Sequence, residues 1–166
     1  MKHCIKIISL AVLVTFFRAG ISEAQITADV PYRIMELETA LETAKEENKK
    51  VILDVYAEWC PYCRRMHNDV YPDEKVSTIL EQYFILVHID IESNENVKFI
   101  DRTITQSQLA RALRSQSTPT TYFMSANGEV IGMQPGLLSA DIFATLLSYI
   151  GSDAYKSQSF EEYSGQ

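Results

Sequence analysis

The sequence predicts a single α/β domain in which helices cover a mixed β-sheet. Two apolar, β-rich runs at 51–57 and 84–91 are hydrophobic on both faces, as strands are when both sides of a sheet are covered. Segments with apolar residues at helical spacing alternate with these runs, and a hairpin pattern follows. The chain has 166 residues, of which 46% are hydrophobic, so it can bury one core and is not a disordered or fibrous chain.

The individual elements follow from periodicity and from turn residues. The expected helices cover 35–48, a segment that begins at Cys60, 73–83, 106–114 and 140–150, and the expected strands cover 51–57, 84–91, 97–100, 103–105, 120–125 and 129–134. Pro61 suits the first turn of a helix, and Ser139 suits an N-cap. Asn127 and Gly128 favour a hairpin turn between the last two strands. A polar tail at 151–166 carries three aromatic residues.

The N-terminal residues have the pattern of a secretory signal peptide over 1–24. A basic start is followed by a short apolar run, and small residues at Ser22 and Ala24 offer a cleavage site. The run is shorter than the roughly 20 apolar residues of a membrane span, so an uncleaved anchor is the less favoured alternative. We therefore expect the protein to be exported to the periplasm.

Removal of 1–24 changes the charge and the cysteine count. It leaves 12 of the 15 basic and 21 of the 22 acidic side chains, so the net charge becomes −9, which argues against nucleic acid and anionic lipid as partners. It also removes Cys4, so Cys60 and Cys63 are the remaining cysteines. A disulfide across so short a loop adds little stability, and the pair therefore indicates chemistry.

Cys60 and Cys63 follow a buried strand and begin a helix. A helix N-terminus favours the thiolate form of Cys60, which is the attacking species in disulfide exchange. Cys63 lies one turn further on, where it can close a disulfide and resolve a mixed disulfide. These two residues are the predicted nucleophile and resolving thiol.

Metal binding is the alternative use of these thiols. Cys60, Cys63 and His67 could supply three zinc ligands, but no second Cys or His cluster completes a structural set. A copper-binding module is possible because thiolates suit Cu(I), although no Met-rich or His-rich cluster supports it. We predict no metal and no cofactor beyond the redox-active Cys60–Cys63 disulfide.

Two polar residues interrupt the buried strands. Asp54, six positions before Cys60, could lie beneath the active-site helix and accept a proton from Cys63, because burial would raise its pKa into a useful range. The alternative is an Asp at a solvated strand end. His88 could face Asp54 across adjacent strands, or it could be a core histidine bonded to backbone.

Several residues near the cysteines are candidates for substrate binding. Trp59 could shape a docking surface beside the sulfurs, with ordinary core packing as the equal alternative. Pro61 and Tyr62 form the intervening dipeptide, and Thr118-Pro119 precedes a strand, where a proline suits a sheet edge or a cis bond.

The motifs around these residues resemble those of thioredoxins. The matching segments are 54–60 (Asp-Val-Tyr-Ala-Glu-Trp-Cys), Pro119-Thr120, 127–130 (Asn-Gly-Glu-Val) and Gly136, spread over about 35–150. The resemblance implies a thioredoxin fold over 25–150, with helices on both faces of the sheet. It also implies that Asp54 is the buried acid and Pro119 the cis-proline, and it places His88 where thioredoxins usually have a lysine.

The departures point to a subgroup. Pro61-Tyr62 replaces the Gly-Pro of cytosolic thioredoxins, and Thr118 before the proline resembles periplasmic members. The extra hairpin near 99–105 and the aromatic tail are most similar to SoxW-type periplasmic thioredoxins, which are associated with sulfur oxidation. The C-terminal domain of DsbD is similar around 54–63.

The expected function is reduction of disulfides in exported proteins. The protein would be kept reduced by a membrane thiol donor of the DsbD or CcdA type and would act as a monomer. An oxidase or isomerase is the alternative, although the chain is too short for the helical insertion or dimerisation domain that such members carry. No residue pattern determines the direction of electron flow.

Overall fold

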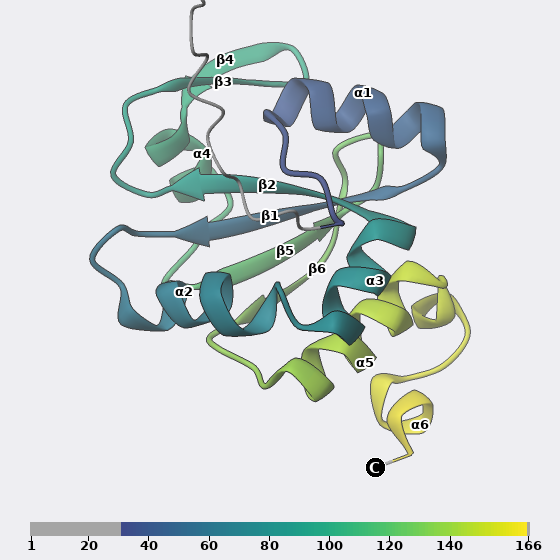
Figure 1. Cartoon of the computed structure of the whole chain (residues 1–166). Helices are drawn as coiled ribbons and strands as arrows, with labels where there is room; N and C mark the ends of the chain where they lie inside the picture. Colours follow the sequence, from purple (N-terminus) through teal and green to yellow (C-terminus); the bar gives the residue numbers. More distant parts are fainter. Residues whose placement is uncertain (1–30, 166) are drawn as a thin grey trace, which may run out of the picture.

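The computed structural model describes residues 31–165 and contains the predicted mixed sheet (Figure 1). Four strands lie in the order β2-β1-β5-β6, with β1 and β2 parallel and the other neighbours antiparallel. Their bounds are β1 (Lys50–Tyr56), β2 (Phe84–Asp90), β5 (Thr120–Met124) and β6 (Val130–Pro135). Antiparallel and parallel neighbours in one sheet confirm the α/β prediction, and the predicted signal peptide (1–24) lies outside the described residues.

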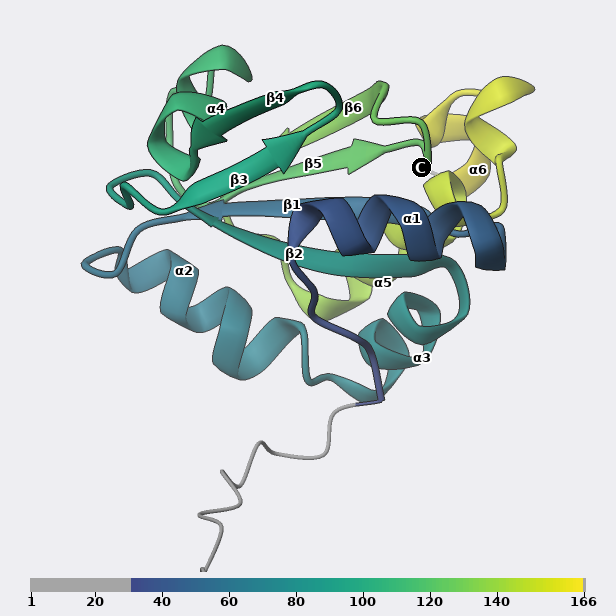
Figure 2. The ribbon, with the colours of Figure 1, turned by 90° about the horizontal axis from the view of Figure 1, so that it is seen from above.

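Helices cover both faces of this sheet (Figures 1 and 2). One face carries α1 and α4 beside a small two-stranded sheet, and the other carries α2, α3 and α5. The helices are α1 (Leu37–Glu47), α2 (Pro61–Arg65), α3 (Glu74–Tyr83), α4 (Gln106–Ala112) and α5 (Ala140–Gly151). Within residues 31–165, none is long and apolar enough to cross a membrane.

The alternation of side chains along β1 determines which layer each residue faces. Val51, Leu53 and Val55 belong to the core under α1 and α4, whereas Ile52 belongs to the core under α3 and α5. Because successive side chains of a strand point to opposite faces, Asp54 lies on the same face as Ile52. The carboxylate therefore points to the layer that contains α2.

Helix α2 continues directly into a π-helical turn, η1 (Met66–Val70). The backbone N–H of Tyr71 donates to the carbonyl oxygen of Met66 at 2.9 Å, which is the wider spacing of a π-helix. His67 lies at the start of this turn. Single π-turns occur often at functional sites because they reorient side chains within a helix.

A second hairpin lies outside the main sheet. Strands β3 (Asn96–Phe99) and β4 (Arg102–Thr105) pair only with each other. The turn falls at Ile100-Asp101, one residue earlier than the predicted Asp101-Arg102, and Ile100 has a φ of 55°. The side chain of Ile100 packs over Gly128. A Cβ atom at position 128 would come within 3.3 Å of Phe99, and the φ of +83° at this position also favours glycine.

The C-terminal segment packs on the domain through its aromatic residues. It forms a 3₁₀ turn η2 (Ala154–Lys156) and helix α6 (Phe160–Ser164), which begins with a capping box from Ser159. Tyr149 of α5 contacts the rings of Tyr155, Phe160 and Tyr163, with centroid separations of 6.5, 5.4 and 5.3 Å. These contacts use the tail aromatics for intramolecular packing.

Candidate active site

Cys60 and Cys63 occupy the start of α2, as predicted. Cys60 is the N-cap, Pro61 is the first helical residue, and the two cysteines form a disulfide with a Cα–Cα separation of 5.3 Å. The backbone N–H of Cys63 donates to the Sγ atom of Cys60 at 3.2 Å. In the reduced state the same N–H group would stabilise negative charge on Cys60.

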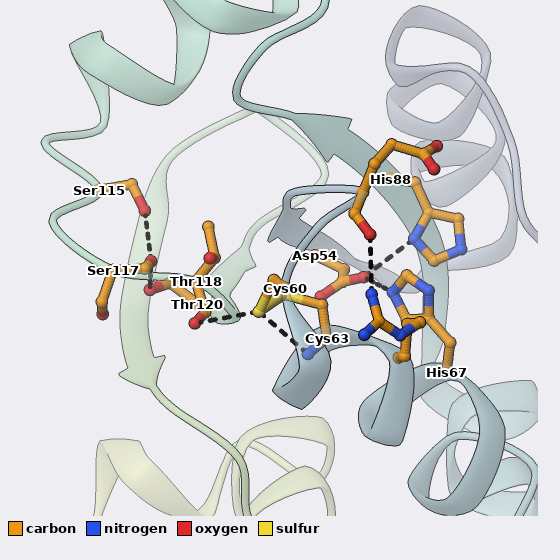
Figure 3. The surroundings of a disulfide bond; sticks show 11 residues. Asp54, Cys60, Cys63, His67, His88, Ser115, Ser117, Thr118 and Thr120 are labelled. Carbon is orange, nitrogen blue, oxygen red and sulfur yellow. Dashed lines mark hydrogen bonds and ion pairs between the residues drawn. A yellow bond between two sulfur atoms is a disulfide. The ribbon is translucent and has the colours of Figure 1, made fainter.

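The loop that precedes β5 brings Thr118 and Pro119 next to the cysteines. The Thr118–Pro119 peptide bond is cis, which is the form that the thioredoxin resemblance implies. The carbonyl oxygen of Thr118 lies 3.5 Å from the Sγ atom of Cys60 (Figure 3). The Pro119 carbonyl accepts a backbone N–H from Gly136 at 2.8 Å, which ties this loop to the end of β6. The loop thus presents backbone directly beside Cys60.

Two aromatic side chains next to the cysteines are exposed. Trp59 is 61% exposed and Tyr62 is 56% exposed, so the core-packing alternative for Trp59 is wrong. A hollow of about 150 Å³ between Trp59, Ile91 and the 115–118 loop lies beside them. Exposed aromatic residues around a reactive group are typical of surfaces that bind other proteins.

Asp54 is completely buried and contacts two histidines. Its Oδ2 atom lies 3.0 Å from Nδ1 of His88 and 2.5 Å from Nε2 of His67 (Figure 3). The solvated strand-end alternative for Asp54 is therefore wrong. Both imidazoles are partly exposed, with 28% of each side chain accessible, so they connect the buried carboxylate to solvent.

The His88 contact follows from strand register. Asp54 on β1 is paired with His88 on the parallel neighbour β2, so the two side chains leave the sheet on the same face. The sequence left two possibilities for His88, and the structure selects the one that faces Asp54.

The sequence indicates His67 only as a possible zinc ligand beside the cysteines, whereas in the structure it contacts Asp54. In the structure it bonds Asp54, while the cysteines bond each other, so these three residues do not form a ligand set in this state. One sequence feature points toward this contact. His67 follows Cys63 by four residues, which puts both side chains on one helix face, and Asp54 is expected beneath that same helix.

The pKa of Asp54 differs in direction from the prediction. Burial raises it, but the hydrogen bonds and charges of His67 and His88 outweigh burial, so the net effect lowers the pKa of Asp54 below its usual range. Asp54 is therefore an anion at neutral pH. The sequence indicated His88 as a possible neighbour of Asp54 but gave no sign of the contact with His67, which lies on another element.

The second carboxylate oxygen has no hydrogen-bond partner among the described residues. Oδ1 of Asp54 and the hydroxyl of Tyr71 are both buried, and neither makes a hydrogen bond of normal geometry with any residue in 31–165, although the phenol lies near enough to Asp54 to interact with it. Burial, and next the nearby Asp54 charge, raise the pKa of Tyr71 well above its usual range, so this phenol stays neutral. Figure 3 draws this second oxygen of Asp54 on the side of the cysteines.

A hollow of about 250 Å³ opens at this cluster. It is lined by Tyr56, Ala57, Glu58, Cys63, Arg64, His67 and His88. The hollow reaches the resolving cysteine and the two imidazoles, and the imidazoles in turn contact the buried carboxylate of Asp54.

Comparison with known proteins agrees with the fold and the site. The model of the thioredoxin-like domain family matches residues 37–151. The chain is 31% identical over 98 residues to the thiol:disulfide interchange protein DsbD of Vibrio cholerae, a match that covers 59% of this chain and 15% of that protein. The chain thus spans only a small part of this relative.

Solved structures give the same result. A thioredoxin-fold protein from Helicobacter pylori superposes with a TM-score of 0.64 at 19% identity, covering 83% of this chain and 84% of the other. A thioredoxin from Thermus thermophilus gives 0.60 at 26% identity, covering 72% and 87%.

The sheet order and the Cys60–Cys63 disulfide at the start of α2 define the class of the protein, a thioredoxin-fold domain with a cysteine pair that can form a disulfide. Its family follows from the match over most of the described residues: the chain belongs to the thioredoxin-like domain family.

Proposed function

We propose that this protein reduces disulfides in exported proteins through a Cys60-linked mixed disulfide. The position of the Cys60 sulfur carries the proposal. It accepts the N–H of Cys63 and lies beside the carbonyl of Thr118, a residue that also lines the hollow next to exposed Trp59. An extended segment of a substrate protein can dock here and bring its own disulfide to Cys60.

The first step is attack by the Cys60 thiolate on a substrate disulfide. A new bond joins Cys60 to one substrate sulfur, and the other substrate sulfur leaves as a thiolate that takes a proton from water. The helix N-terminus and the Cys63 N–H lower the energy of the attacking thiolate.

The second step releases the substrate. Cys63 loses its proton, attacks Cys60, and forms the disulfide seen in the structure while the second substrate sulfur leaves as a thiolate. Asp54 is the proposed proton acceptor for Cys63, through its unpartnered Oδ1 atom. His67 and His88 hold Oδ2 and orient the carboxylate, and their exposed sides give the proton a route to water.

The location and the electron donor extend this proposal. The signal-like residues 1–24 support export to the periplasm, and the similarity to part of DsbD supports protein disulfides as substrates. Each cycle leaves the protein oxidised, so a membrane thiol donor of the DsbD or CcdA type is the proposed source of electrons. The SoxW resemblance, and with it a link to sulfur oxidation, stays a prediction, as does the monomeric state.

The reduction potential of Cys60–Cys63, measured against glutathione buffers, tests the direction of electron flow. A value of about −270 mV or below supports a reductase, since thioredoxin has this potential. A reduction potential of about −120 mV would overturn the reductase proposal and make the protein a disulfide donor, which is the oxidase alternative.

A further inference from the structure

The cluster beneath the disulfide has the composition of a metal site. We infer that His67, His88 and Asp54 bind one divalent transition-metal ion of the Zn²⁺ type. Two imidazole nitrogens and one carboxylate are a common open ligand set for Zn²⁺ and related ions. The candidate ligand atoms, Nε2 of His67, Nδ1 of His88 and a carboxylate oxygen of Asp54, all lie within 4.8 Å of one another.

The present distances require only a small adjustment. Zn²⁺ bonds nitrogen and oxygen at about 2.0–2.2 Å, so neighbouring ligands in a tetrahedral site are roughly 3.4 Å apart. The two imidazole nitrogens now lie 2.5 and 3.0 Å from Oδ2 of Asp54. Each contact would lengthen by less than about 1 Å when hydrogen bonds are replaced by bonds to the metal.

One carboxylate oxygen of Asp54 is available to bind a metal ion. Asp54 is completely buried, and its Oδ1 atom has no hydrogen-bond partner in the described part of the chain. A buried unpartnered oxygen is costly, and a cation would satisfy it. The metal could therefore bind Oδ1, Oδ2 or both, and where it binds Oδ2 the metal bonds of the two imidazoles replace their hydrogen bonds to that oxygen.

The site is accessible. The hollow of about 250 Å³ is lined by both histidines, Cys63, Glu58 and Arg64, and it has room for an ion and one or two waters beside the imidazoles. Water in this hollow would complete the coordination, as in zinc sites with three protein ligands. A bound ion would occupy the carboxylate that the proposed mechanism uses, a consequence that rests on the proposed function.

The disulfide form provides a clean test, because its sulfurs cannot serve as thiolate ligands. The full chain contains three histidines and a third cysteine, so a His3→Gln, Cys4→Ser background leaves His67 and His88 as its only imidazoles and no thiol outside the Cys60–Cys63 disulfide. Calorimetric titration of this oxidised chain with Zn²⁺ should show one saturable site. Binding to the disulfide form does not depend on redox activity, so failure here is distinct from failure of the proposed function.

Two variants assign the site. His67→Gln and His88→Gln should each weaken Zn²⁺ binding at least about tenfold. Asp141→Asn, which removes an exposed carboxylate paired with Lys75, should leave it unchanged. Equal affinities in all variants would show adventitious binding to surface carboxylates and would overturn the proposal, as would the absence of saturable binding.

Imidazole NMR tests the site without any change to its residues. In the metal-free protein, donation to Asp54 requires the proton on Nε2 of His67 and on Nδ1 of His88. Metal binding at these same atoms displaces those protons and leaves Nδ1 of His67 and Nε2 of His88 as the protonated nitrogens. Nitrogen-15 spectra should therefore show loss of the proton from Nε2 of His67 and from Nδ1 of His88 as Zn²⁺ is added, and retention of both protons at saturating Zn²⁺ would overturn the inference.

Discussion

The Nε2 atom of His67 lies 2.5 Å from Oδ2 of Asp54, although one residue comes from a π-turn after α2 and the other from the central strand β1. This contact and the one from His88 hold a fully buried carboxylate in its charged form directly under the cysteine helix. The chemistry beneath the disulfide is thus controlled by a three-residue cluster rather than by a lone acid.

The two cysteines should behave differently when each is replaced. Cys63→Ser should accumulate a mixed disulfide with an oxidised substrate protein, because the Cys60 adduct forms and cannot be resolved. Cys60→Ser should form no adduct. Non-reducing electrophoresis and mass spectrometry measure both, and equal trapping by the two variants would contradict the assignment of Cys60 as the nucleophile.

Asp54→Asn should slow the resolving step. Loss of a positioned proton acceptor costs about a hundredfold or more at neutral pH, and the deficit should shrink at alkaline pH, where Cys63 ionises without help. Stopped-flow release of substrate from the mixed disulfide, in buffer with a metal chelator, measures this step. Asp141→Asn is the matched control for loss of a carboxylate, and an unchanged rate at pH 7 in Asp54→Asn would exclude the proposed role.

The lowered pKa of Asp54 also predicts how stability depends on pH. A carboxyl whose pKa is lower in the folded state contributes stability above its unfolded value, near 3.8, and this contribution is lost as the pH falls through the folded value. The oxidised protein should therefore lose more unfolding free energy than Asp54→Asn between pH 5 and the acid limit. Urea unfolding of both chains in metal-free buffer measures the difference, and parallel pH curves would contradict the prediction.

Trp59→Ala should weaken the binding of substrate proteins without altering the chemistry of the disulfide. The ring is 61% exposed beside the cysteines, so its loss should raise the KM for a protein substrate about tenfold. The reduction potential against glutathione should stay the same, which separates docking from redox tuning. An unchanged KM would remove Trp59 from the docking surface.

Phe160→Ala should destabilise the protein by about 1–2 kcal/mol, because the ring packs on Tyr149 and anchors α6 to α5. Glu161→Ala, an exposed change on the same helix, is the control. Urea unfolding measures both. Reductase turnover at a temperature where both variants are folded should equal that of the unchanged chain, and a selective loss of turnover in Phe160→Ala would instead indicate a functional tail.

The local features of this protein were predictable from sequence because they depend on neighbouring residues. The apolar runs predicted β1 and β2, Pro61 predicted the start of α2 at the cysteines, and Asn127-Gly128 predicted the turn between β5 and β6. The position of Asp54 in a buried run also predicted its burial. Each of these follows from periodicity, or from the backbone preferences of a few adjacent residues.

Only the tertiary structure decided what surrounds Asp54. The contact with His88 depends on the register of two strands 34 residues apart, and the contact with His67 depends on how the π-turn packs against the sheet. Neither arrangement is encoded in a local pattern, so burial alone predicted a raised pKa for Asp54, whereas the two imidazoles lower it. The sequence by itself therefore determined the fold and the reactive pair, and long-range packing determined the charge beneath them.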